Sequence, residues 1–119
     1  MPQEDQDRRI DYIEFPVADL EQAKRFYGTV FNWSFTDYGP DYTSFADGRL
    51  SGGFFKAETV QPGGPLVVIY ALDLEQVEEE IATHGGTIVK ESFEFPGGRR
   101  FHFRDPSGYE LAVWSDKQP

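Results

Sequence analysis

Two polar side chains near the N-terminus share one face of a predicted strand. Tyr12 and Glu14 alternate with apolar residues over Arg9–Val17, so both side chains point the same way. If a helix packs over the apolar positions, Glu14 points into a concavity, where a carboxylate is costly unless it is paired or hydrated. A carboxylate in such a place suits a general base or an acid that binds a ligand. The alternative is a salt bridge across the sheet to Arg100 or Arg104.

A second set of polar groups lies on a predicted hairpin near the C-terminus. The turn, DPSG at 105–108, combines a side-chain acceptor, a proline ring and a final glycine, as type I turns do. His102 precedes the turn and Glu110 follows it, each on a strand with two different faces. An imidazole transfers protons near neutral pH, which makes His102 a candidate catalytic group. The alternatives are a structural role for His102 and simple exposure near the turn for Glu110.

Aromatic residues make up 16% of the chain, enough to line a cavity as well as a core. Some of them are candidates for walls around a planar or cationic ligand. The alternative is ordinary packing in the core or at a dimer interface. The catalytic candidates are Glu14, His102 and Tyr12, and the ligand-binding candidates are Phe54, Glu110 and Trp114.

Composition excludes several classes of protein. The 21 acidic and 11 basic residues leave a net charge of −10, which repels nucleic acid and anionic lipid. The chain has no cysteine, so disulfides, thiolate metal sites and cysteine nucleophiles are excluded. The longest apolar run, Leu66–Leu72, is far shorter than the roughly 20 residues of a membrane helix, and Met1–Arg9 lacks the apolar segment of a signal peptide. We therefore expect a cytoplasmic protein with a small-molecule ligand and no nucleic-acid or membrane partner.

The first half of the chain predicts one helix and four strands. After the strand at 9–17, Asp19 can cap a helix, with Gln22 three residues further on. Apolar residues at helical spacing then continue to Phe31 or Asn32. Three short strands, separated by turn residues, are expected at 33–38, 42–46 and 53–57.

The second half repeats this order after a linker at 59–65 that is rich in glycine and proline. The sequence DLEQ at 19–22 recurs at 73–76, between a predicted strand at 66–72 and a helix that ends at the glycines 85 and 86. A strand at 87–91, extended to 95, and the hairpin follow. The chain is thus predicted to be a single α+β domain over 9–119, with modules at 9–58 and 66–116 of order βαβββ and a disordered tail at 1–8.

Four segments carry a resemblance to a known family: RIDYIEFPVADL at 9–20, AKRFY at 23–27, VFNW at 30–33 and FRDPSGYEL at 103–111. They resemble segments of the vicinal oxygen chelate superfamily, which contains glyoxalase I, extradiol dioxygenases and bleomycin-binding proteins. The likeness is to short glyoxalase-like members related to lactoylglutathione lyase. It implies two βαβββ modules that form curled mixed sheets around a cavity, with the helices outside, and a homodimer.

The resemblance also implies where metal ligands would lie, on the first and last strands of each module. Tyr12 stands at the usual first-strand His or Gln, Val67 at the His of the second module and Ala112 at the last-strand Glu. The fourth position falls near Gly53 or Phe54. Valine and alanine offer no donor, so the usual ligand set for Zn, Ni, Mn or Fe is absent. We therefore expect no metal and no other cofactor.

Two functions follow from these residues and the resemblance. The first is a metal-independent isomerase or lyase acting on a small oxygenated metabolite, with Glu14 as base and His102 or Tyr12 as its partner. The second is non-catalytic binding of a cationic or planar compound, similar to that of the bleomycin-binding proteins. A weak site for a hard cation, built from Glu14, His102 and Glu110, is a further alternative.

Overall fold

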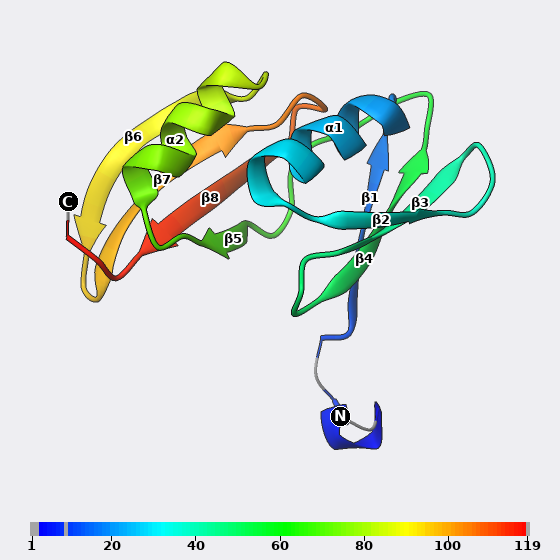
Figure 1. Cartoon of the computed structure of the whole chain (residues 1–119), viewed down its shortest axis with the longest axis horizontal. Coiled ribbons are helices and arrows are strands. Elements are labelled where there is room, and N and C mark those ends of the chain that lie inside the picture. The colour runs from blue at the N-terminus through cyan, green and yellow to red at the C-terminus, as the bar shows by residue number, and fades with distance from the viewer. Residues whose placement is uncertain (1–2, 9, 119) are drawn as a thin grey trace. The chain divides into compact units, whose positions relative to one another are not determined.

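The computed structural model describes residues 3–8 and 10–118, which form two compact units. The units are Met1–Thr59 and Val60–Pro119, so the division falls at the start of the segment predicted to be a linker. Among the described residues, each unit contains one α-helix and four strands in the order βαβββ, as the sequence repeat predicts (Figure 1). The α+β class with two mixed four-stranded sheets is therefore confirmed.

The first unit places its strands in the order β1-β4-β3-β2, with β1 and β4 parallel and the other pairs antiparallel. A short 3-10 helix, η1 (Gln3–Gln6), lies within the segment expected to be a disordered tail. The other elements are β1 (Tyr12–Val17), α1 (Leu20–Phe31), β2 (Ser34–Asp37), β3 (Tyr42–Ala46) and β4 (Ser51–Lys56).

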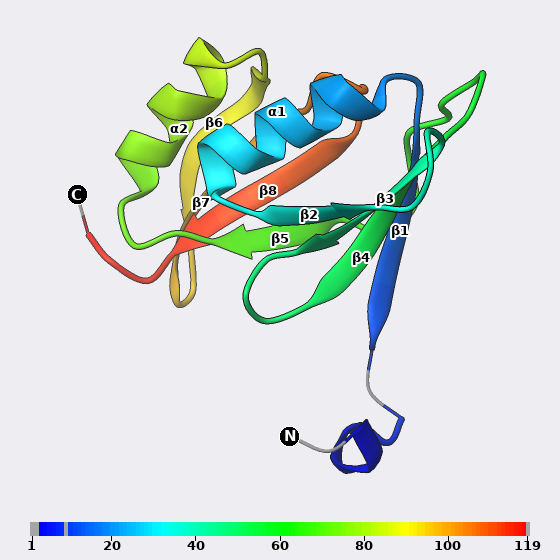
Figure 2. The same cartoon turned by 45° about the vertical axis from the view of Figure 1, so that its right-hand side comes forward.

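The second unit has the same arrangement, with strand order β5-β8-β7-β6 and a parallel β5–β8 pair. Figures 1 and 2 both show α2 lying along one face of this sheet. Within the described residues, no helix is long and apolar enough to span a membrane. The elements are β5 (Val67–Tyr70), α2 (Leu74–Thr83), β6 (Thr87–Phe95), β7 (Gly98–Arg104) and β8 (Glu110–Ser115).

The repeated tetrapeptide starts both helices in the same way. The Asp19 carboxylate accepts a hydrogen bond from the Gln22 N–H at 3.0 Å, and the Asp73 carboxylate accepts one from the Gln76 N–H at 3.1 Å. Each bond satisfies an N–H that has no partner within the helix. Helix α1 ends at Asn32, which adopts a left-handed conformation with φ 61°. These starts and the end of α1 agree with the sequence pattern.

The predicted hairpin is also confirmed. The Gly108 N–H donates to the Asp105 carbonyl at 2.9 Å, which closes the turn between β7 and β8. The Asp105 carboxylate also accepts hydrogen bonds from the N–H groups of Ser107 and Tyr109. The turn therefore fixes the register in which His102 lies opposite Ala112.

Each unit has its core between the helix and one face of the sheet. In the first unit, the Phe54 ring packs against Tyr27 and Phe45 at centroid distances of 5.5 and 5.1 Å. In the second, Ile81 of α2 and the strand residues facing it are fully buried. Those strand residues are Phe101, Phe103, Leu111 and Val113. The opposite face of each sheet, the helix-free face, carries the polar residues predicted to do chemistry.

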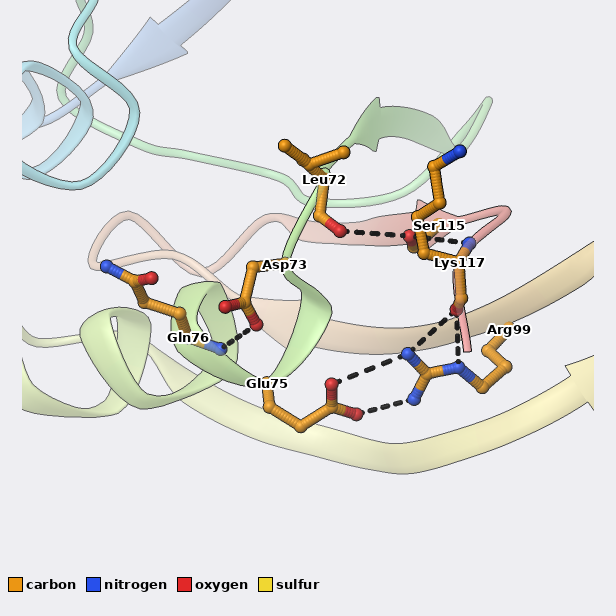
Figure 3. A network of polar contacts seen from close by, with 7 residues as sticks. All are labelled: Leu72, Asp73, Glu75, Gln76, Arg99, Ser115 and Lys117. Carbon is orange, nitrogen blue, oxygen red and sulfur yellow. Dashed lines mark hydrogen bonds and ion pairs between the residues drawn. The ribbon is translucent and has the colours of Figure 1, made fainter. Parts of the chain in front are cut away.

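Arg99 ties the C-terminal segment to α2 (Figure 3). Its guanidinium donates to both carboxylate oxygens of Glu75 and, from Nε and Nη2, to the Lys117 carbonyl at 3.1 and 3.0 Å. The Arg99 side chain is 7% exposed. One buried cation therefore connects the helix, β7 and the end of the chain.

Candidate functional site

Glu14 and Tyr12 belong to a chain of three hydrogen-bonded side chains in the first unit. The Tyr42 hydroxyl donates to Glu14 Oε2 at 2.9 Å and lies 2.5 Å from the Tyr12 hydroxyl. The three residues come from β1 and β3, which flank β4. Glu14 shares the helix-free face with Tyr12, as the alternation predicts. Among the described residues, the Glu14 carboxylate accepts a hydrogen bond from the Tyr42 phenol and forms no salt bridge with an arginine.

Gly53 makes room for this chain of side chains. It is opposite Glu14 on β1 and Ser44 on β3, so it lies between the strands that carry the two tyrosines. A Cβ atom at Gly53 would be 2.1 Å from the Tyr42 hydroxyl and 2.7 Å from the Tyr12 hydroxyl. Both phenols therefore occupy the space above a residue that has no side chain.

The directions of the hydrogen bonds follow from the number of protons. Tyr42 has one hydroxyl proton, and the Glu14 carboxylate can only accept, so that proton lies between Tyr42 and Glu14. Tyr12 must then donate to Tyr42. Burial of the Tyr42 hydroxyl raises the pKa of this group well above its usual value, and the hydrogen bonds with Tyr12 and Glu14 raise it further. Tyr42 is therefore a neutral donor at physiological pH.

Sequence reasoning missed Tyr42, which it placed only as the first residue of a short strand. Its role depends on the strand order β1-β4-β3, because β4 contributes a glycine at the position between the two tyrosines. The sequence does hold a signal, because two adjacent glycines inside a strand, Gly52-Gly53, are typical of a bulge or of a close approach by a neighbouring strand. That signal did not identify the approaching side chain.

Phe54 does not lie where a ligand wall was expected. Its side chain is 2% exposed and packs in the core between sheet and helix. It alternates with Gly53, so it points to the opposite face from Glu14. We therefore correct the assignment of Phe54 from ligand-binding residue to core residue.

His102 and Glu110 form a pair on the helix-free face of the second unit. His102 Nδ1 lies 2.8 Å from Glu110 Oε2, while the residue itself is 7% exposed. Glu110 stands opposite Arg104 in the register but forms its short contact diagonally, with the imidazole. The side chain of Glu110 is 47% exposed, so one end of the pair is open to solvent.

The other nitrogen of this imidazole, Nε2, is buried and has no hydrogen-bond partner among the described residues. A carboxylate beside Nδ1 favours the tautomer with the proton on Nδ1, which leaves a lone pair on Nε2. The Phe93 ring lies 6.0 Å from the imidazole. His102 is therefore held in place by Glu110 while its Nε2 atom lacks a hydrogen bond, so it is not a structural histidine with both nitrogens satisfied.

Trp114 lies on the same face and has aromatic neighbours within the second unit. Its ring centroid is 5.2 Å from that of Tyr70 and 6.2 Å from that of Phe95. Arg100 is opposite Trp114 in the β7–β8 register, and its guanidinium lies 5.2 Å from the Phe93 ring and 5.8 Å from the Phe95 ring. Arg100 Nε is buried without a hydrogen-bond partner among the described residues, a situation that costs about 1–3 kcal/mol.

The residues at the family's metal positions do not fit a metal ion. In the register, the residue beside Ala112 is Val68, whereas Val67 lies beside the buried Leu111. Neither valine offers a donor to a metal ion. Within the part of the chain that the structure describes, no three His, Asp or Glu residues are close enough to hold a metal. Glu14 belongs to the first unit, while His102 and Glu110 belong to the second.

Comparison with known proteins defines the class. A family model described as Glyoxalase/Bleomycin resistance protein/Dioxygenase superfamily matches residues 9–113. The chain therefore belongs to this superfamily, as the resemblance of its motifs indicated. The fold agrees, since a glyoxalase-related enzyme from Fulvimarina pelagi superposes with a TM-score of 0.77 at 20% identity, covering 91% of this chain and 88% of that chain.

Two further relatives show the range of proteins with this likeness. The fosfomycin resistance protein FosX from Mesorhizobium loti has a TM-score of 0.76 at 16% identity and covers 91% of this chain and 92% of its own. "Putative glyoxylase CFP32" of Mycobacterium bovis is 25% identical over 117 residues, which are 87% of this chain and 44% of that protein. The chain thus spans less than half the length of this curated relative.

Proposed function

We propose that the protein is a proton-transfer enzyme, an isomerase or lyase acting on a small oxygenated metabolite without a metal ion. Glu14 is the base, and Tyr12 is the partner linked to it through Tyr42. The observation that carries the proposal is the Glu14–Tyr42–Tyr12 chain of hydrogen bonds on the helix-free face of the first unit. Membership of a superfamily named for enzymes and for a resistance protein is compatible with this activity.

The two oxygens of the Glu14 carboxylate have different surroundings. Oε2 accepts the Tyr42 proton, while Oε1 has no hydrogen-bond partner among the described residues. The residue is exposed, so Oε1 is available to a substrate. In the proposed reaction, Oε1 removes a proton from a carbon beside a carbonyl group, and the electron pair of the broken C–H bond forms an enolate. For a 2-hydroxy carbonyl substrate, Glu14 returns that proton to the former carbonyl carbon, and the substrate hydroxyl proton moves to the former carbonyl oxygen, which completes an isomerisation.

Tyr12 and Tyr42 allow the carboxylate to exchange its proton with an oxygen of the substrate. Once Glu14 has returned the carbon proton, a substrate hydroxyl beside Tyr12 can pass its proton along the two phenols to Glu14 Oε2, since each phenol accepts one proton as it donates another. Glu14 then gives that proton to the former carbonyl oxygen of the substrate. Tyr42 suits this role because it remains protonated at physiological pH. His102, oriented by Glu110 in the second unit, is a second proton-transfer candidate.

Hydrogen–deuterium exchange tests the proposal without knowledge of the substrate. A panel of small 2-hydroxy and 2-oxo carbonyl compounds is incubated with the protein in D2O, and exchange at carbon is followed by NMR. The wild type should accelerate exchange for a subset of the panel, and Glu14→Gln should lower that rate by about 10²–10⁴-fold. Glu58→Gln, which changes another exposed glutamate, is the matched control. An unchanged rate in Glu14→Gln would remove Glu14 as the base.

A second candidate function is binding of a planar compound without turnover. The observation in its favour is the aromatic cluster of Trp114, Tyr70 and Phe95. Binding of a panel compound with no exchange catalysed by the wild type would favour this candidate.

The cytoplasmic location and the homodimer expected from the resemblance remain predictions, and light scattering of the purified chain tests the dimer.

A further inference from the structure

Positive charge gathers on the helix-free face of the second unit, although the whole chain has a net charge of −10. Three cations lie on this face: Lys90, Arg100 and Arg104. Arg100 and Arg104 alternate along β7 with the buried Phe101 and Phe103, and Lys90 of β6 is opposite His102. Among the described residues none of the three forms an ion pair. The one acidic neighbour in this register, Glu110, is held by His102.

Aromatic rings surround the central cation of this group. Phe93 and Phe95 contact the Arg100 guanidinium, and Lys90 Nζ lies 4.5 Å from the Phe93 centroid. Trp114 is directly opposite Arg100 in the register. Phe93, Phe95, Arg100 and Trp114 are all partly accessible rather than core residues. A guanidinium stacked on rings keeps its planar edge for a carboxylate or phosphate group, which it can bind with two parallel hydrogen bonds.

Two polar atoms on this face lack partners. Arg100 Nε and His102 Nε2 are buried without hydrogen bonds among the described residues. The two residues are separated by two positions along β7, which corresponds to about 7 Å. Arg100 Nε is a donor, and His102 Nε2 is an acceptor when Nδ1–H points to Glu110. After a shift of the side chains that now cover these atoms, a ligand oxyanion would satisfy the donor, and a hydroxyl group on the same ligand would satisfy the acceptor.

We infer that the helix-free face of the second unit binds a planar organic oxyanion, with Arg100 on the anionic group and Trp114 and Phe95 against the planar body. The three cations on this face favour an anionic ligand over the cationic ligand considered from the overall composition. The inference goes beyond the proposed proton transfer, because it concerns affinity and requires neither turnover nor Glu14.

Calorimetric titration with matched probes tests the inference. 2-Naphthoate has the anionic group and the planar body, 2-naphthamide keeps the body without the charge, and inorganic phosphate keeps the charge without the body. The wild type should bind 2-naphthoate at least about tenfold more tightly than either of the other two. Arg100→Gln should lower the naphthoate affinity by about tenfold or more and abolish the preference over the amide.

Two further variants keep the result interpretable. Arg100→Lys retains the charge but not the planar fork, so it should bind more weakly than the wild type and more tightly than Arg100→Gln. Arg25→Gln removes an exposed arginine of α1 and should leave the affinity unchanged. Thermal unfolding of each variant establishes that it is folded.

Three results would overturn the inference. Equal binding of the naphthoate and the amide would show an apolar surface without an anion site, and equal binding of phosphate would show a cation without a planar subsite. Absence of saturable naphthoate binding up to about 1 mM would show that the face has no such site. Failure of the exchange assay for Glu14 would leave the binding result standing, since the readout here is affinity.

Discussion

A Cβ atom on Gly53 would lie 2.1 Å from the hydroxyl oxygen of Tyr42, far inside van der Waals contact. The phenol thus occupies space that every other residue type at position 53 would fill. Gly53→Ala should therefore displace Tyr42 and Tyr12 and break the hydrogen bond to Glu14. We expect a loss of stability of about 1–2 kcal/mol, because side chains rather than backbone must move. Urea denaturation, together with the exchange rate, measures both effects.

The neighbouring glycine provides the comparison. A Cβ atom on Gly52 would lie 2.1 Å from the Ile13 carbonyl oxygen and 2.3 Å from the Phe45 ring. Backbone of the paired strand cannot give way as a side chain can, so Gly52→Ala should cost about 3 kcal/mol or more. Equal stability losses for Gly52→Ala and Gly53→Ala would contradict this account of the two glycines.

The Arg99–Glu75 contact predicts a dependence of stability on pH. The hydrogen bond from Arg99 holds the pKa of Glu75 below its usual value of 4.5. Because the folded-state pKa is lower than the unfolded one, the contact stabilises the fold above pH 4.5 and is lost as the pH falls through the folded-state pKa. Glu75→Gln should therefore melt below the wild type at pH 7, and the difference should vanish in acid.

Melting curves from pH 7 down to about pH 3 test this dependence. Glu79→Gln, on the same helix, is the control, since the Glu79 side chain is exposed and Arg99 does not contact it. A difference between Glu75→Gln and the wild type that persists unchanged at the acid end would show that charge pairing is not its source.

The His102–Glu110 pair predicts a change of tautomer. With Glu110 present, the proton should reside on Nδ1, and Nε2 should be unprotonated in the neutral ring. Glu110→Ala removes this acceptor, so the proton should no longer be held on Nδ1, and the lost hydrogen bond should cost about 1 kcal/mol. Nitrogen chemical shifts of His102 report the tautomer directly. The proton on Nε2 in the wild type, or no shift change in Glu110→Ala, would disprove the orientation proposed here.

The sequence was sufficient for the fold because its signals are local. Asp19 and Asp73 each fix the start of a helix within three residues, and the turn at 105–108 fixes a hairpin within its own length. Period-two alternation also placed Glu14 on the face away from the helix. Each of these inferences depends on neighbours in the chain and on no knowledge of strand order.

The site depends on contacts between distant residues and was therefore predicted only in part. Tyr42 meets Glu14 because the strand between them carries a glycine, and that strand order is a property of the sheet. Phe54 was assigned to a ligand wall because the run Gly52-Gly53-Phe54-Phe55 does not alternate between polar and apolar residues, so the sequence did not show which face of β4 packs on the helix. The diagonal contact of His102 with Glu110 could likewise not be derived from alternation alone.

The central claim is that Glu14 and Tyr42 act as one unit in proton transfer. A double-mutant cycle of Glu14→Gln and Tyr42→Phe, followed by deuterium exchange into the best substrate of the panel, tests it most directly. The account predicts that each single variant loses most of the rate and that the double variant is no slower than Glu14→Gln alone. Rate losses that multiply in the double variant, or an unaffected rate in Tyr42→Phe, would contradict the claim.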